Sequence, residues 1–307
     1  MSALEIMKDL FFIERGYLNS NHFVYRSKEP ILIDTAYISD FEITERLISD
    51  LGVDLSRTRL IINTHTHCDH IGGNRTIQER SGCDIALHKI GKYFIDTRDD
   101  WSTWWRYYSQ DAAFFHCTLA LEDGDVIAVG PNEFRVIHTP GHASDGIVLY
   151  GAKDKVLISS DTLWESDMGV MTIRVEGSTA LFHMLESLEK LESLDVEAVF
   201  PGHGKPFKDI KGAISRSKKR VQSFMKNREN IGTDLLKKIM IYTLLMQRQI
   251  DEDRFYDQLM ETHWFRETID LYFDKEYKQK YDELITDFFN RGIVKQRDGK
   301  LYTTVKP

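Results

Sequence analysis

Residues 60–70 read Leu-Ile-Ile-Asn-Thr-His-Thr-His-Cys-Asp-His and place three histidines and an aspartate directly after an apolar run. The apolar run is short and rich in β-branched side chains, which is typical of a buried strand. Imidazole nitrogens and carboxylate oxygens are ligands of borderline divalent metals. The turn that follows this strand is therefore predicted to carry four metal ligands, which are His65, His67, Asp69 and His70.

Three more candidate ligands follow apolar runs that are typical of strands. They are His142 after residues 134–137, Asp161 after residues 156–158 and His203 after residues 196–200. Small residues adjoin each of them, so the backbone can turn sharply there. One such histidine would carry little weight, but the three together predict ligands gathered at one edge of a sheet.

The rest of residues 1–207 mixes short strands with helices. Further strands are expected at 11–13, 23–25, 31–33, 85–87 and 147–150, and helices at 41–51 and 178–194. This mixture predicts an α/β fold in which two sheets pack together with helices outside.

The ordered set of these ligands resembles the metallo-β-lactamase superfamily over roughly residues 8–207. The resemblance implies an αββα sandwich in which His65, His67 and His142 hold one metal ion, and Asp69, His70 and His203 hold a second. It makes Asp161 the bridge between the ions. It also implies that Asp34 supports the site without being a ligand.

This resemblance implies two divalent metal ions, with zinc favoured and iron or manganese as alternatives. A pair of ions can share a hydroxide that is nucleophilic at neutral pH. Asp69 is the candidate catalytic residue, because its carboxylate could orient this hydroxide or transfer a proton. The thiol of Cys68, between two ligands, is expected to face away from the site.

Residues 91–119 are unusually aromatic. We expect Trp101, Trp104, Trp105 and Tyr108 of this segment, together with Trp164, to line a substrate pocket. A lid, a contact between two copies of the chain, and plain packing against the core are the alternatives for the segment.

The loops around His142 and His203 resemble those of hydrolases near glyoxalase II. The expected function is therefore the hydrolysis of an ester, thioester or lactone with an apolar part. Two alternatives stay open. One is an iron-dependent oxidoreductase or dioxygenase of the same fold, and the other is a ligand-sensing regulator that binds DNA through its C-terminal part.

Residues 208–307 are expected to form a separate, mainly helical domain that resembles a winged helix. Helical periodicity is seen at 235–246, 254–260 and 281–289, and Asp298-Gly299 signals a hairpin turn. Residues 1–207 have a net charge of −13 and residues 208–307 a net charge of +5. DNA binding is not favoured, since acidic residues adjoin the second of these helices.

The composition predicts a cytoplasmic protein, and the family resemblance implies a small-molecule substrate. No apolar run reaches the roughly 18 residues of a membrane span, and Glu5, Lys8 and Asp9 interrupt the segment that a signal peptide would need. Three cysteines do not suggest a disulfide framework. A homo-oligomer is compatible with the sequence, and nucleic acid is not an expected partner.

Overall fold

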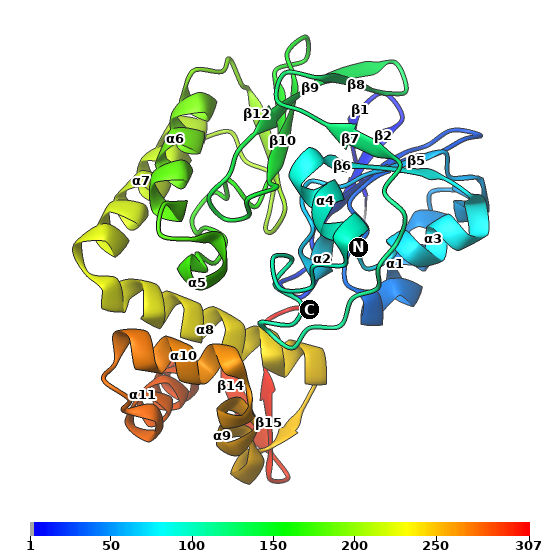
Figure 1. Cartoon of the computed structure of the whole chain (residues 1–307). Coiled ribbons are helices and arrows are strands. Elements are labelled where there is room, and N and C mark those ends of the chain that lie inside the picture. Colours follow the sequence, from blue (N-terminus) through cyan, green and yellow to red (C-terminus); the bar gives the residue numbers. More distant parts are fainter. Residues whose placement is uncertain (1–2) are drawn as a thin grey trace.

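A computed structural model describes residues 3–307 and divides them into a large sandwich of two sheets and a smaller C-terminal part (Figure 1). The first sheet has seven strands in the order β1-β2-β3-β4-β5-β6-β7. Pairing is antiparallel from β1 to β4 and parallel from β4 to β7. The strands are β1 (Leu4–Met7), β2 (Leu10–Ile13), β3 (His22–Tyr25), β4 (Ile31–Ile33), β5 (Leu60–Ile62), β6 (Asp84–His88) and β7 (Leu119–Leu121).

The second sheet has five strands in the order β12-β11-β10-β9-β8. Only β11 and β12 are parallel, and the other neighbours are antiparallel. The strands are β8 (Val126–Val129), β9 (Asn132–His138), β10 (Ile147–Gly151), β11 (Val156–Ser160) and β12 (Ala198–Pro201).

Strands in the middle of both sheets are buried on both faces, which explains their unbroken apolar sequences. Ile31 and Ile33 of β4 point into the core between the sheets, whereas Leu32 packs under the helices outside. In the second sheet Leu149 of β10 faces the inner core and Val148 faces the outer helices.

Helices cover the outer face of each sheet. Ile48 of α1 (Phe41–Ser49) and Ile77 of α3 (Asn74–Ser81) pack on the first sheet. On the second sheet lie α6 (Ala180–Glu192) and α7 (Ile210–Lys226). The short α2 (Cys68–Ile71), α4 (Lys89–Thr97), α5 (Ile173–Glu176), η1 (Ile38–Asp40) and η2 (Leu55–Arg57) lie in the connections. The four layers are the αββα sandwich that the sequence predicted.

The C-terminal part is mainly helical and includes a three-stranded sheet in the order β13-β15-β14. Its elements are α8 (Arg228–Gln247), β13 (Ile250–Asp251), α9 (Glu252–Glu261), α10 (His263–Tyr272), α11 (Tyr277–Asn290), β14 (Val294–Arg297) and β15 (Lys300–Thr303). The predicted hairpin is confirmed: Asp298 and Gly299 both have positive φ, which a two-residue turn requires. The winged-helix resemblance stays a prediction.

The long helix α8 lies between the sandwich and the remaining C-terminal elements (Figure 1). Helix α7 before it packs against α6, with Ile214 and Val221 in the core of the sandwich. The division after residue 207 stays a prediction, and the packing of α7 favours a boundary near Asn227 instead.

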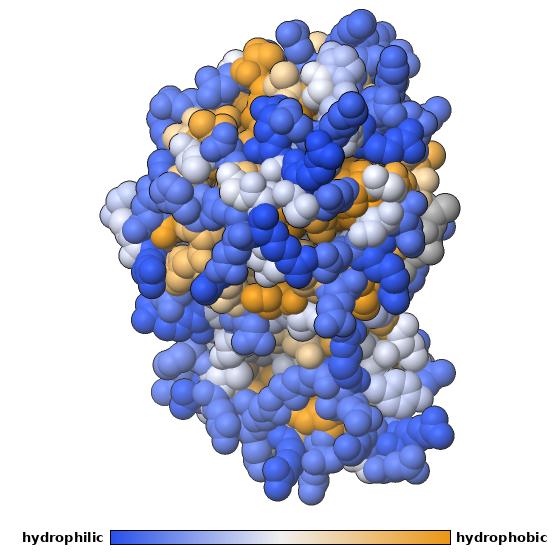
Figure 2. All heavy atoms as spheres, turned by 90° about the vertical axis from the view of Figure 1, so that its right-hand side faces the viewer, coloured by the Kyte–Doolittle hydropathy of each residue, from blue (hydrophilic) through white to orange (hydrophobic). Residues whose placement is uncertain are grey.

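The surface seen in Figure 2 is largely hydrophilic, with apolar residues exposed in small patches. Among the helices of residues 3–307, none combines the length and the apolar character that crossing a membrane requires.

Candidate metal centre

All seven predicted ligands lie in connections that follow strands, where the two sheets meet, and two of them, Asp69 and His70, are in the short helix α2. The turn from His65 to His70 follows β5 of the first sheet. His142, Asp161 and His203 follow β9, β11 and β12 of the second sheet. Both sheets thus contribute to one centre, and every ligand residue is at most 9% exposed.

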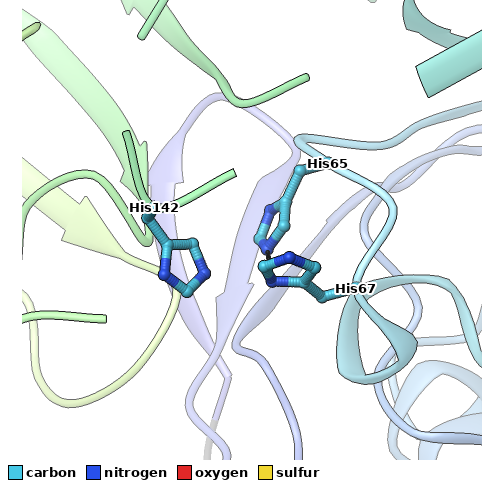
Figure 3. Close-up of side chains that lie close together, drawn as sticks. All are labelled: His65, His67 and His142. Carbon is cyan, nitrogen blue, oxygen red and sulfur yellow. Dashed lines mark hydrogen bonds between the residues drawn. The ribbon is translucent and has the colours of Figure 1, made fainter. Parts of the chain in front are cut away.

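His65, His67 and His142 form the first cluster, and one ring nitrogen of each lies within 4.8 Å of the others. Figure 3 shows His142 approaching from the side opposite to His65 and His67. The Nε2 atom of His65 lies 2.9 Å from the Nδ1 atom of His67. Three convergent imidazoles are a suitable donor set for zinc or a similar ion.

Asp69, His70, Asp161 and His203 form the second cluster, again within 4.8 Å. Asp69 Oδ2 lies 3.1 Å from His203 Nε2. Asp161 Oδ2 lies 3.5 Å from His70 Nε2 in its own cluster and 3.5 Å from His142 Nε2 in the first. Asp161 therefore stands between the two clusters, where a bridging carboxylate would have to be.

The outward nitrogens of three ligand histidines each face an oxygen acceptor. His70 Nδ1 donates to Asp34 Oδ2 at 2.8 Å. His142 Nδ1 donates to the Val170 carbonyl at 2.8 Å, and His203 Nδ1 to the Gly16 carbonyl at 3.0 Å. These acceptors favour the proton on Nδ1, which leaves the Nε2 lone pair directed into the centre.

The buried nitrogens fit a metal centre. Nε2 of His70 and Nε2 of His142 have no hydrogen-bond partner among residues 3–307. Buried polar atoms in proteins are rarely left without a partner, because desolvation is costly. A divalent ion bound in each cluster would give these two nitrogen atoms a partner.

Burial and mutual repulsion keep the first cluster neutral. Burial, followed by the charge of neighbouring imidazoles, holds the pKa of His65 and of His67 well below 6.5. Burial acts in the same direction on His70, but the charges of Asp34 and Asp161 outweigh it and raise the pKa of His70. Neutral imidazole is the form that binds metal.

A pocket with about 470 Å³ of empty space opens onto the centre. Apart from the ligands and from Gln110 and Lys238, its wall residues are aromatic, aliphatic or glycine. They are formed by Tyr17, Trp104, Gln110, Trp164, Gly169, Val170, Lys238, Ile239 and Tyr242.

Trp104 covers one ligand of the first cluster. Its ring centroid lies 3.7 Å from that of His67. Its Nε1 donates to Glu176 Oε1 at 2.7 Å. The backbone of Trp104 has a φ of 70°, a conformation that is costly for a bulky residue and is concentrated at functional sites.

The structure places only part of the predicted aromatic set in the pocket. Trp104 and Trp164 line it, but Trp101, Trp105 and Tyr108 do not. Trp105 Nε1 donates to the Thr66 carbonyl at 2.9 Å, behind the ligand turn, and Tyr108 bonds to Thr172. Both rings pack in the core with α8 and α10, so packing accounts for most of this segment.

Sequence reasoning missed the contribution of α8, which supplies Lys238, Ile239 and Tyr242 to the pocket. A signal was present in residues 239–245, which read Ile-Met-Ile-Tyr-Thr-Leu-Leu without a charged face. A helix of this kind is buried on more than one side. Cys68 belongs to neither cluster and does not line the pocket, and its thiol lies 3.6 Å from the Tyr242 hydroxyl.

A sandwich that gathers five imidazoles and two carboxylates at its strand ends defines a class of metal-dependent enzymes. Residues 15–203 match the metallo-beta-lactamase superfamily, and the chain belongs to this superfamily.

Two relatives with assigned names are a hydroxyacylglutathione hydrolase and an acyl-coenzyme A thioesterase. The hydroxyacylglutathione hydrolase of Rhodospirillum rubrum is 34% identical over 144 residues, which are 47% of this chain and 47% of that protein. The human acyl-coenzyme A thioesterase MBLAC2 is 27% identical over 242 residues, covering 67% of this chain and 84% of that protein. The family and these relatives identify the chain as a metal-dependent hydrolase.

Solved structures share the fold. A metallo-beta-lactamase family protein of Thermus thermophilus superposes with a TM-score of 0.63 at 18% identity, over 97% of this chain and 100% of that one. A subclass B3 metallo-beta-lactamase of Bradyrhizobium japonicum gives a TM-score of 0.58 at 17% identity, over 78% and 95% of the two chains.

Proposed function

We propose that the chain hydrolyses thioesters, or related esters and lactones, that carry an apolar acyl group, and that it does so with two divalent metal ions. The observation that carries this proposal is a pocket with apolar walls that opens onto two adjoining clusters of ligands. The first ion would be held by His65, His67 and His142, and the second by Asp69, His70 and His203, with Asp161 shared. The nitrogen-rich donor set favours zinc.

Two bound ions would lower the pKa of water to roughly 7 and polarise the carbonyl oxygen of the substrate. The chain itself supplies proton transfer through Asp69, whose carboxylate reaches the pocket. This carboxylate can accept a proton from the attacking water and return it to the leaving thiolate or alkoxide. The products are a carboxylic acid and a thiol or an alcohol.

The pocket walls favour an acyl group without charge. Trp104, Trp164, Val170 and Ile239 offer apolar surface, on which an acyl chain can exclude water. The only lysine in the wall, among the described residues, is Lys238, and its ammonium already contacts Asp167, Asp234 and the Met168 carbonyl. It is therefore not free to pair with an anionic substrate group.

Two measurements test this proposal. Elemental analysis of protein purified without added metal should find about two divalent ions per chain. The same protein should turn over acyl-coenzyme A, acyl-glutathione or lactone substrates. His142→Ala should abolish this turnover, whereas His116→Ala, at an exposed histidine, should not. Cleavage of phosphodiesters but of no ester would contradict the proposal, as would a single iron without hydrolysis, which the dioxygenase alternative predicts.

A further inference from the structure

Two ligand histidines depend on backbone carbonyls for their orientation. His142 Nδ1 donates to the Val170 carbonyl and His203 Nδ1 to the Gly16 carbonyl. Groups that accept the outer proton of a ligand histidine fix its ring and tune its basicity. A carbonyl stays in place only if its loop does, so the contacts that hold these two loops matter for the metal centre.

The loop of Val170 is held by α8. Lys238 is 8% exposed, and its Nζ donates to the Met168 carbonyl at 2.7 Å. The same ammonium lies 3.1 Å from Asp167 and 2.9 Å from Asp234. The ammonium thus donates to two oxygen atoms of this loop and forms an ion pair with Asp234 of its own helix. These contacts tie α8 to the loop two residues before Val170.

This loop and the His142 ring are in close contact. A Cβ atom placed on Gly169 would lie 2.5 Å from His142 Nδ1, closer than real Cβ contacts allow. A movement of this loop would therefore displace the His142 ring. A displacement of Met168 would reach His142 directly.

The loop of Gly16 also contacts the C-terminal part of the chain. The Tyr242 hydroxyl of α8 donates to the Leu18 carbonyl at 3.1 Å. The backbone N–H of Tyr17 donates to the Lys306 carbonyl at 2.8 Å. The two carbonyls that orient His142 and His203 thus lie on loops that both accept a hydrogen bond from α8, which lies under the sandwich in Figure 1.

We infer that Lys238 and Tyr242 are positioning residues of the metal centre, through which α8 sets the orientation of His142 and His203. The inference rests on the proposed two-metal centre. It gives the C-terminal part of the chain a role in metal binding within its own molecule.

Adjacent lysines of α8 provide a matched test. Lys238→Met keeps an apolar stem of similar length and removes the bond to Met168. Lys237→Met makes the same change one position away, where the lysine pairs with Asp287 of α11 at 2.8 Å. The affinity of each variant for zinc is measured by competition with a chelator, together with the visible spectrum of the cobalt-loaded protein.

Lys238→Met should lower the affinity for one of the two zinc ions about 10- to 100-fold, which is the usual effect of losing a group that orients a ligand. It should also change the visible spectrum of the cobalt-loaded protein. The zinc affinity of Lys237→Met should stay within about threefold of that of the parent protein. Equal affinities in the two variants would overturn the inference.

A double variant separates positioning from simple destabilisation. Lys238→Met removes a positive charge that pairs with the Asp234 carboxylate, and this loss by itself lowers the free energy of unfolding. Adding Asp234→Asn removes the carboxylate charge without restoring the bond to Met168. The double variant should recover the thermal midpoint of the metal-free protein but not the zinc affinity. If it recovers both, the effect came from the unpaired carboxylate and the inference is wrong.

Tyr242→Phe tests the second loop. It removes the hydroxyl that bonds to Leu18 and should weaken zinc binding about tenfold. Tyr150→Phe is the control, because that hydroxyl makes the same kind of bond to the Asp195 carbonyl far from the centre. Equal affinity in these two variants would refute the role of Tyr242. Failure of the parent protein to bind two ions would instead refute the proposed function.

Discussion

Asp34 supports the ligand turn with both carboxylate oxygens. Oδ1 accepts from the Thr64 N–H at 2.8 Å, and Oδ2 accepts from the Thr64 hydroxyl and from His70 Nδ1, each at 2.8 Å. Asp34→Ala should therefore lower the affinity for one metal ion by about 10- to 100-fold. Zinc titration against a chelator measures this loss. The exposed Asp54→Ala is the control, and equal affinity in both variants would contradict the role of Asp34.

Glu176, which accepts the indole N–H of Trp104, makes stability depend on pH. Burial raises the pKa of Glu176 from its ordinary 4.5 to about 8. In the unfolded chain Glu176 ionises near 4.5, whereas the folded protein keeps the proton up to about pH 8. Its contribution to stability is therefore full below pH 4.5, falls as the pH rises to about 8, and is constant above that.

Glu176→Gln cannot ionise and still offers Trp104 an acceptor. Between pH 5 and 8.5 the parent protein should lose about 4 kcal/mol more unfolding free energy than this variant, because the pKa of Glu176 differs by several units between the unfolded and folded states. Urea unfolding at both pH values, in the presence of chelator so that metal loss does not contribute, gives the comparison. Parallel pH profiles of the two proteins would show that Glu176 is charged in the folded state near neutrality.

At the scale of elements, the segment between α4 and β7 has no regular structure and yet supplies a pocket wall. Trp104→Ala should reduce kcat/KM for apolar acyl thioesters by about 10- to 100-fold, because the lost apolar contact corresponds to about 1.5–3 kcal/mol. The metal content should remain two ions per chain. Trp101→Ala, outside the pocket, is the control, and similar kinetics of the two variants would exclude Trp104 as a substrate wall.

At the scale of the whole molecule, the candidate ligands come from both sheets of the sandwich, so bound ions would connect the sheets. The turn after β5 comes from one sheet, and the loops after β9, β11 and β12 come from the other. Ions that bind only the folded state stabilise it by about 2.7 kcal/mol when present at a hundredfold excess over Kd. Metal removal should therefore lower the thermal midpoint by about 5 °C or more. Calorimetry before and after chelation, with elemental analysis of both samples, provides the check; an unchanged midpoint after complete removal would count against a centre that cross-links the sheets.

The fold and the seven candidate ligands could be predicted because their signals are local. Strands β4 and β5 are buried on both faces, so their sequences are continuous apolar runs. The edge strands β1, β7 and β8 were not predicted, because exposed positions dilute the pattern, whereas the mostly buried edge strand β12 was predicted as the run 196–200. Leu119 of β7 is 42% exposed and Val126 of β8 is 65% exposed. Continuous apolar runs thus identified the buried strands of each sheet and missed the strands whose side chains are exposed.

The sequence by itself determined which side chains can bind metal, since the type of a residue and its position after an apolar run can both be recognised from the sequence. Only the tertiary structure decided what surrounds them. The acceptors of His142 and His203 are backbone carbonyls, which every residue has and no sequence pattern distinguishes. Trp104 and Trp105 are neighbours of identical type, and only the backbone conformation sends one to the pocket and the other behind the ligand turn. Helix α8 closes the pocket from more than thirty residues beyond the last ligand, because packing brings together segments that the sequence keeps apart.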